Sequence, residues 1–162
     1  MSVTGYSPKQ IWLHWIIAVL IIVQFVLQEG MSDMWHQVSR GQTLTPTLIG
    51  QSHVVIGILI FVLGAYRLFV RLNRGAPAAP ADEPAVLRFL AGATHLALYA
   101  VILVMPVSGS VAWFGGVKAA AEAHEVGKAI MLLFVALHVA GAIYQHFILK
   151  TDVVRRMVRA ER

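Results

Sequence analysis

Two histidines in the stretch 123–150, AHEVGKAIMLLFVALHVAGAIYQHFILK, carry the clearest chemical signal in the chain. Each begins a His-x-x-Gly motif, His124 to Gly127 and His138 to Gly141, inside a run that otherwise has the composition of a membrane helix. The histidines are 14 residues apart. In a helix this is close to four turns, so both rings leave one face about 21 Å apart. Glycine after each ring lets a large flat group lie against the backbone. The pattern predicts ligands for a group shaped like a porphyrin.

The composition predicts a membrane protein. Of 162 residues, 58% are hydrophobic and only 13% are charged, and the apolar runs are long enough to span a bilayer. The chain has no cysteine, which excludes an iron–sulfur cluster, a covalently attached haem and disulfides. The net charge is +5, but the basic residues flank apolar segments and are better explained as topology signals than as a nucleic-acid surface. We therefore expect membrane lipid, and no nucleic acid, as a partner.

The apolar runs predict an all-α membrane protein, a single four-helix transmembrane domain over residues 1–162. Ser7, Pro8 and Gln10 have the pattern of a capping box that begins the first helix. A signal peptide is the competing interpretation of this helix, but no small-x-small cleavage site follows it. Residues 28–46 are expected to form an interfacial loop that contains His36, and Pro106 is expected to kink the third helix. The predicted spans are about 8–29, 47–72, 85–114 and 120–150.

The distribution of basic residues predicts the orientation. With four helices, the N-terminus, the second loop and the C-terminus share one side of the membrane, and most of the lysines and arginines lie there. The other side has only Arg40, Lys118 and Lys128. The excess of positive charge predicts that both termini are cytoplasmic, in a bacterial-type inner membrane.

This topology decides which histidines can share one iron. His14, near the start of the first helix, and His138, about three turns before the end of the fourth, lie at a similar depth on the cytoplasmic side. His53 and His124 both begin helices on the outer side. The crossed pairs would join opposite halves of the bilayer and are excluded by length. An isolated intramembrane histidine is often a packing residue, but four at consistent depths indicate two haem sites.

Further polar and small residues lie where they could contribute to these sites, and the sequence leaves more than one role open for each of them. Arg67 lies 14 residues after His53, so its guanidinium could bind a haem propionate or could only snorkel to the interface. Gly57 follows His53 by one turn, although small residues also serve helix contacts. For His95 and His146, a hydrogen-bonded packing role and a role in quinone binding or proton delivery stay open. A non-haem metal site is disfavoured because the membrane interior has neither cysteine nor carboxylate.

Four segments together resemble the bacterial cytochrome b561 family, including its superoxide oxidase branch. They are SPKQIWLHW, QSHVVIGILIFVLGAYRLFVRL, THLALYAVILVMPVSG and AHEVGKAIMLLFVALHVAGAIYQHFILKTD. The resemblance covers essentially the whole chain. It implies an inner-membrane oxidoreductase with two non-covalent b-type haems, ligated by His14 with His138 and by His53 with His124. It also implies electron exchange with ubiquinone and, in the superoxide oxidase branch, oxidation of periplasmic superoxide.

One departure from the family affects the expected substrate. The connection between the third and fourth helices, about residues 115–121, is shorter than in superoxide oxidases. Lys118 and Lys128 would still attract an anion to the outer haem, and we assign this role to Lys128. The alternative function is that of a membrane-anchor subunit that passes electrons for a partner dehydrogenase or hydrogenase. This alternative would require a stable complex with a redox partner protein.

Overall fold

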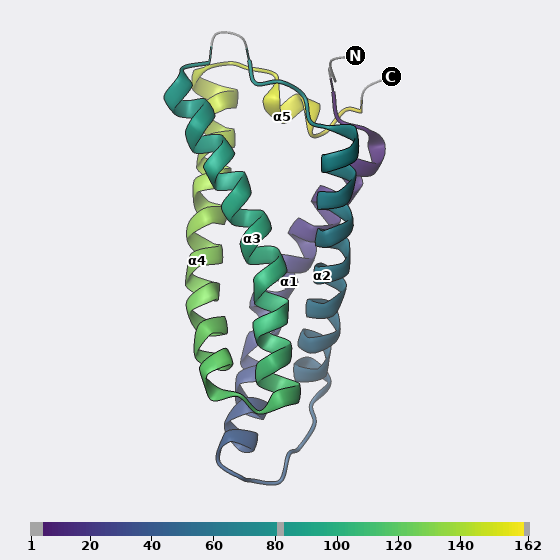
Figure 1. Cartoon of the computed structure of the whole chain (residues 1–162), viewed down its shortest axis with the longest axis vertical. Helices are drawn as coiled ribbons and strands as arrows, with labels where there is room; N and C mark the ends of the chain where they lie inside the picture. The colour runs from purple at the N-terminus through teal and green to yellow at the C-terminus, as the bar shows by residue number, and fades with distance from the viewer. Residues whose placement is uncertain (1–4, 81–82, 161–162) are drawn as a thin grey trace.

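The computed structural model describes residues 5–80 and 83–160, and it is an all-helical bundle (Figure 1). Each of its four long segments is long and apolar enough to cross a membrane. The predicted fold class, a membrane protein of four spanning helices, is therefore confirmed. The last of these segments is α4 followed directly by a π-helical turn, η1, and a short helix closes the described chain. The elements are α1 (Pro8–Ser39), α2 (Leu48–Arg74), α3 (Ala85–Gly115), α4 (Lys118–Ile143), η1 (Tyr144–Ile148) and α5 (Val153–Arg156).

The predicted capping box begins α1. The Ser7 hydroxyl accepts from the Gln10 backbone N–H at 3.3 Å, and the Gln10 side chain accepts from the Ser7 backbone N–H at 3.0 Å. The buried Gln10 side chain also donates to the carbonyl of Gly75, just after α2, at 2.9 Å. Gln10, which completes the capping box of α1, thus links the start of α1 to the end of α2.

The predicted end of the first helix is wrong. α1 continues to Ser39, through much of the segment that we expected to be an interfacial loop. Met34, only 1% exposed, explains the extension, because it packs at the start of α2, where Thr47 donates to its sulfur at 3.4 Å. The burial of an apolar side chain outweighs the polar composition that suggested a loop. His36 consequently lies on the last turn of α1.

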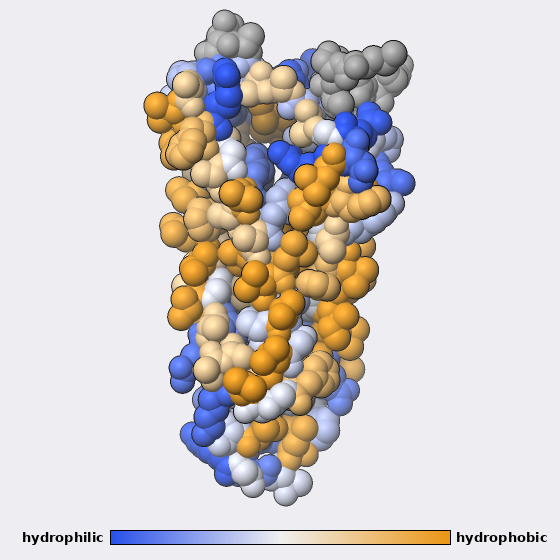
Figure 2. Space-filling view, in the orientation of Figure 1, coloured by the Kyte–Doolittle hydropathy of each residue, from blue (hydrophilic) through white to orange (hydrophobic). Residues whose placement is uncertain are grey.

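Two helix pairs form the bundle. α1 packs chiefly on α2 and α3 packs chiefly on α4, while a smaller contact joins α2 to α3. Gly64 permits that contact, since a Cβ at this position would lie 2.7 Å from Ile102 of α3. Many large apolar side chains are exposed around the middle of the bundle, as Figure 2 shows, and the more hydrophilic residues gather toward its ends. This surface suits contact with lipid.

Candidate functional site

The structure brings both predicted histidine pairs together between facing helices. The His53 ring on α2 and the His124 ring on α4 have centroids 6.3 Å apart. The His14 ring on α1 and the His138 ring on α4 have centroids 6.0 Å apart. α4 therefore contributes one histidine to each pair, at two levels of the bundle.

These separations fit a metal ion held between two imidazoles. Imidazole nitrogens bind such metals at about 2 Å, so two opposed rings that share one ion have centroids about 6 Å apart. Both pairs meet this requirement with the side chains as they stand. A haem iron, which takes one axial ligand on each face of its ring, is the metal that two opposed histidines suit.

α3 orients the ring of His124. Its Nδ1 lies 2.9 Å from the Met105 carbonyl oxygen and 3.3 Å from the Ser108 hydroxyl. Because a carbonyl only accepts, Nδ1 carries the proton and donates, which leaves Nε2 unprotonated and available to a metal. Gly109 lies against the same ring, and a Cβ there would be 3.0 Å from Cε1 of His124. The sequence reasoning did not identify Ser108 and Gly109, although the small polar run SGS in an apolar span was a usable signal.

His53 has a different environment. Its Nδ1 is buried and makes no hydrogen bond within the described part of the chain, whereas its backbone carbonyl accepts from Gln24 of α1 at 3.0 Å. The Oε1 atoms of Gln24 and Gln28 are also buried without a partner among the same residues. The Nδ1 atom of His124 thus has hydrogen-bond partners on α3, whereas the Nδ1 atom of His53 has none among the described residues.

The pair of His53 and His124, called the outer pair after the side on which the sequence predicts it, lines a cavity of about 840 Å³ between the helices. This volume is within the range of protein sites for sizeable organic ligands. The apolar lining includes Phe25, Ile60 and Met131, while Trp35 and His36 line it from the extended end of α1. Its charged lining residues are two lysines and two glutamates, Lys118, Glu122, Glu125 and Lys128. These charges cancel, and Lys128 is paired with Glu125 at 2.6 Å, so the lining does not carry the net positive charge that we expected from the lysines alone.

A third imidazole lies beside the pair of His14 and His138, called the inner pair after its predicted cytoplasmic side. The ring of His95 on α3 has its centroid 5.2 Å from that of His138, closer than the roughly 6 Å expected of two rings on opposite sides of one ion. His95 thus lies beside the inner site as a neighbour of His138. His146 in η1 is exposed, and its ring contacts the adjacent Phe147.

Arg67 lies near the inner pair, as its spacing from His53 predicts. Its guanidinium Nη1 donates to the carbonyl of Gln10 at 2.6 Å, which ties α2 to the first turn of α1. It is close enough to interact electrostatically with both His14 and His138. A partly buried cation beside the two rings fits an anionic group at this level of the bundle.

The glycines near the histidines differ in their surroundings. A Cβ at Gly57 would lie 3.1 Å from Gln24, and a Cβ at Gly127 would lie 3.0 Å from Met105, so protein side chains adjoin both positions. Gly141 has nothing within 4 Å of a Cβ position. Gly141 therefore leaves open space on α4 close to His138, where a flat group could lie.

The described residues provide no group of three histidine, aspartate or glutamate side chains that could hold a metal ion alone. The four histidines predicted to be ligands instead lie as two pairs of imidazole rings. This arrangement suits a macrocycle that supplies the remaining ligands itself.

The sequence model of the family described as prokaryotic cytochrome b561 matches residues 5–160. The chain belongs to this cytochrome b561 family. Its similarity to cytochrome b562 of Cereibacter sphaeroides is 33% identity over 159 residues, 96% of each chain. Cytochrome b561 homolog 1 of Escherichia coli is 26% identical over 174 residues, 94% of this chain and 96% of that one. A probable superoxide oxidase, CybB of Yersinia pestis, is 26% identical over 181 residues, 97% of each chain.

Membership in the cytochrome b561 family gives the protein its general role. It is a multi-pass bacterial membrane protein that binds haem b and transfers electrons. The two histidine pairs are the features of its interior that match this chemistry, because imidazole is an axial ligand of haem iron.

Proposed function

We propose that this cytochrome b561 holds two b-type haems and carries electrons across the inner membrane from periplasmic superoxide to ubiquinone. The observation that carries the proposal is the presence of two opposed histidine pairs, with centroid separations of 6.0 and 6.3 Å, at two levels of one bundle. In this proposal His14 and His138 hold the inner haem, and His53 and His124 hold the outer one. Each haem, when bound, would supply a one-electron redox centre at its histidine pair.

The protein's own residues set the environment of these centres. The carbonyl of Met105 holds the proton of His124 at Nδ1, which keeps Nε2 directed away as a ligand. Open space beside Gly141 accommodates a flat ring next to His138. In our proposal Arg67, within the inner half of the bundle, compensates the negative charge of a propionate. Gly57 and Gly127 stay predicted contributors to haem contact.

The outer cavity receives the proposed substrate. Superoxide is an anion, and the Lys128 side chain, 35% exposed at the cavity, provides a nearby positive charge. Glu125 offsets this charge, so the steering by Lys128 is local and not a property of the whole opening. Each superoxide gives up one electron and leaves as dioxygen. Two superoxide ions, one ubiquinone and two protons thus yield two dioxygen molecules and one ubiquinol.

The inner half of the bundle is the proposed place of quinone reduction. His95 lies beside His138, and its half-buried ring can donate a hydrogen bond or a proton to a quinone oxygen. His146 is exposed on η1 at the same end of the molecule, where protons are available from water. His95 is the better placed of the two, because it adjoins a proposed haem ligand.

Stopped-flow spectroscopy of the purified protein tests the proposed reaction. Superoxide should rapidly reduce haem in the oxidised protein, and ubiquinone should reoxidise it. His95→Gln should slow the reoxidation by quinone and leave the reduction by superoxide unchanged. Arg40→Gln, at an exposed residue outside the cavity and both histidine pairs, is a control that should change neither rate. If two haems are present but superoxide does not reduce them, the reaction is refuted and the membrane-anchor alternative is favoured. A partner dehydrogenase or hydrogenase that co-purifies with the protein would then support that alternative.

A further inference from the structure

The C-terminal segment after α4 crosses the end of the bundle and attaches to other elements. The π-helical turn η1 ends α4, and Lys150 has a positive φ of 51°, so the chain turns sharply. Arg156 of α5 then donates to the carbonyl of Ala78, in the connection between α2 and α3, at 3.0 Å. The indole N–H of Trp15 on α1 donates to the carbonyl of Met157 at 2.9 Å. The segment is therefore fixed in place at this end.

The contact with Trp15 also sets the depth of this segment in the membrane. Trp12 and Trp15 are 68% and 47% exposed on the first turns of a spanning helix. Exposed tryptophans on such helices lie at the boundary between the hydrocarbon and the headgroups. Because Met157 is hydrogen-bonded to one of these indoles, the residues around it lie at the level of the lipid headgroups.

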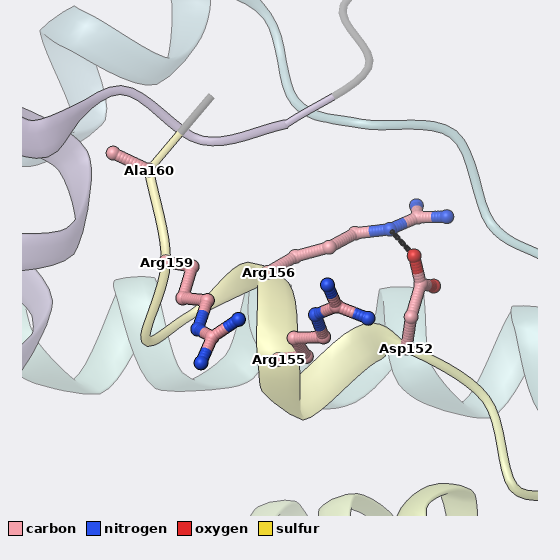
Figure 3. A pocket seen from close by; sticks show the side chains of 5 residues that line it. All are labelled: Asp152, Arg155, Arg156, Arg159 and Ala160. Atoms are coloured by element: carbon pink, nitrogen blue, oxygen red, sulfur yellow. Dashed lines mark hydrogen bonds and ion pairs between the residues drawn. The ribbon is translucent and has the colours of Figure 1, made fainter. Parts of the chain in front are cut away.

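Three arginines line one hollow of about 780 Å³ in this segment, together with Asp152 and Ala160. Figure 3 shows that Arg155, Arg156 and Arg159 lie around this common space. Asp152 neutralises only Arg156, with an Nε to Oδ2 distance of 2.9 Å. The exposed guanidinium groups of Arg155 and Arg159, one turn apart, make no ion pair within residues 5–80 and 83–160. The hollow thus has a net charge of +2.

We propose that Arg155 and Arg159 bind the phosphate of an acidic phospholipid headgroup. The guanidinium groups match phosphate oxygens in geometry and charge, and the segment that carries them is held at headgroup depth. The adjacent Val158, 63% exposed, can contact the upper part of the acyl chains. The net charge of the hollow favours an acidic headgroup over a zwitterionic one. The bound lipid would then stabilise the segment that joins α4 to α1.

Native mass spectrometry of the intact, haem-loaded protein with added phosphatidylglycerol or phosphatidylcholine tests this site. Wild-type protein should retain phosphatidylglycerol in preference to phosphatidylcholine. The double variant Arg155→Gln/Arg159→Gln should weaken phosphatidylglycerol binding by about thirtyfold. This value assumes that each arginine contributes to the binding free energy what a basic residue near an acidic membrane surface usually contributes. The pair Arg155→Lys/Arg159→Lys keeps the charge and loses the guanidinium geometry, so its binding should lie between that of wild type and that of the double glutamine variant.

A matched control changes the charge by the same two units at the opposite end of the molecule, at an exposed residue outside the cavity. Arg40→Glu should leave this binding unchanged, and the haem spectrum of all variants should equal that of wild type, which shows that they fold. The proposal is overturned if the Arg155/Arg159 double glutamine variant binds phosphatidylglycerol as tightly as wild type, or if the two lipids bind wild type equally. Displacement of the lipid by inorganic phosphate at similar concentration would assign the arginines to a free anion and would also overturn it.

Discussion

At the scale of single residues, the orientation of His124 depends on contacts that α3 provides. The Met105 carbonyl, which can only accept, favours the proton on Nδ1, the Ser108 hydroxyl lies beside the same nitrogen, and Gly109 leaves room for the ring. Hydrogen bonds to the side chain of a metal ligand fix the direction of that ligand and influence its basicity. The outer site is therefore sensitive to small changes on a helix that contributes none of the four proposed ligands.

Gly109→Ala should disturb the outer haem site selectively. The new methyl group would lie 3.0 Å from Cε1 of His124 and would displace the ring from its present position. We expect a loss or spectral shift of one haem and no change in the other, measured by reduced-minus-oxidised spectra. Gly92→Ala on the same helix is the matched control, because nothing lies within 4 Å of its added carbon. Equal spectra for the two variants would contradict the expected contact.

Lys128 and Glu125 should have opposite effects on the reaction with superoxide. Lys128→Gln removes the local positive charge at the outer cavity and should slow reduction by superoxide several-fold at low salt. Glu125→Gln removes its neutralising partner and should increase the rate. Both effects should diminish as salt is added, because exposed charges are screened. Stopped-flow rates at two ionic strengths measure them, and changes of the same sign in both variants would exclude electrostatic steering by this pair.

At the scale of elements, the helix assignments were predictable because long apolar runs and the capping box at Ser7 are local signals. The end of α1 could not be predicted, because it depends on the burial of Met34 against the start of α2, which is a contact between separate helices. The two histidine pairs could be predicted from depth alone. Two contacts of α3 could not be predicted, because they depend on how this helix is rotated about its axis. These are the contact of His95 with His138 and that of Ser108 with His124.

The close approach of α2 and α3 should depend on Gly64. Gly64→Val would place new atoms where Ile102 now lies, 2.7 Å from the first added carbon. Overpacking of this kind costs about 1–3 kcal/mol, so the midpoint of thermal unfolding in detergent should fall. Gly92→Val adds the same atoms at an open position and should change the midpoint little. A similar midpoint for both variants would show that the contact does not limit stability.

At the scale of the whole molecule, the start of α1 and α5 lie at one end of the bundle (Figure 1). The distribution of lysine and arginine predicts that this end is cytoplasmic. A green fluorescent protein fused after residue 162 should therefore be fluorescent, and alkaline phosphatase fused at the same place should be inactive. The opposite result would reverse the direction of the proposed electron transfer and would place the pair of His53 and His124 on the cytoplasmic side.

The central claim is that each opposed histidine pair holds one haem, and haem quantification with dithionite-reduced minus oxidised spectra tests it most directly. Wild-type protein should contain two b haems per chain, and His124→Ala and His138→Ala should each lose one, with different spectral components missing. His146→Ala, which changes an exposed histidine outside both pairs, should retain two. If His124→Ala and His138→Ala kept the haem content and the spectrum of wild type, the two-haem arrangement would be contradicted.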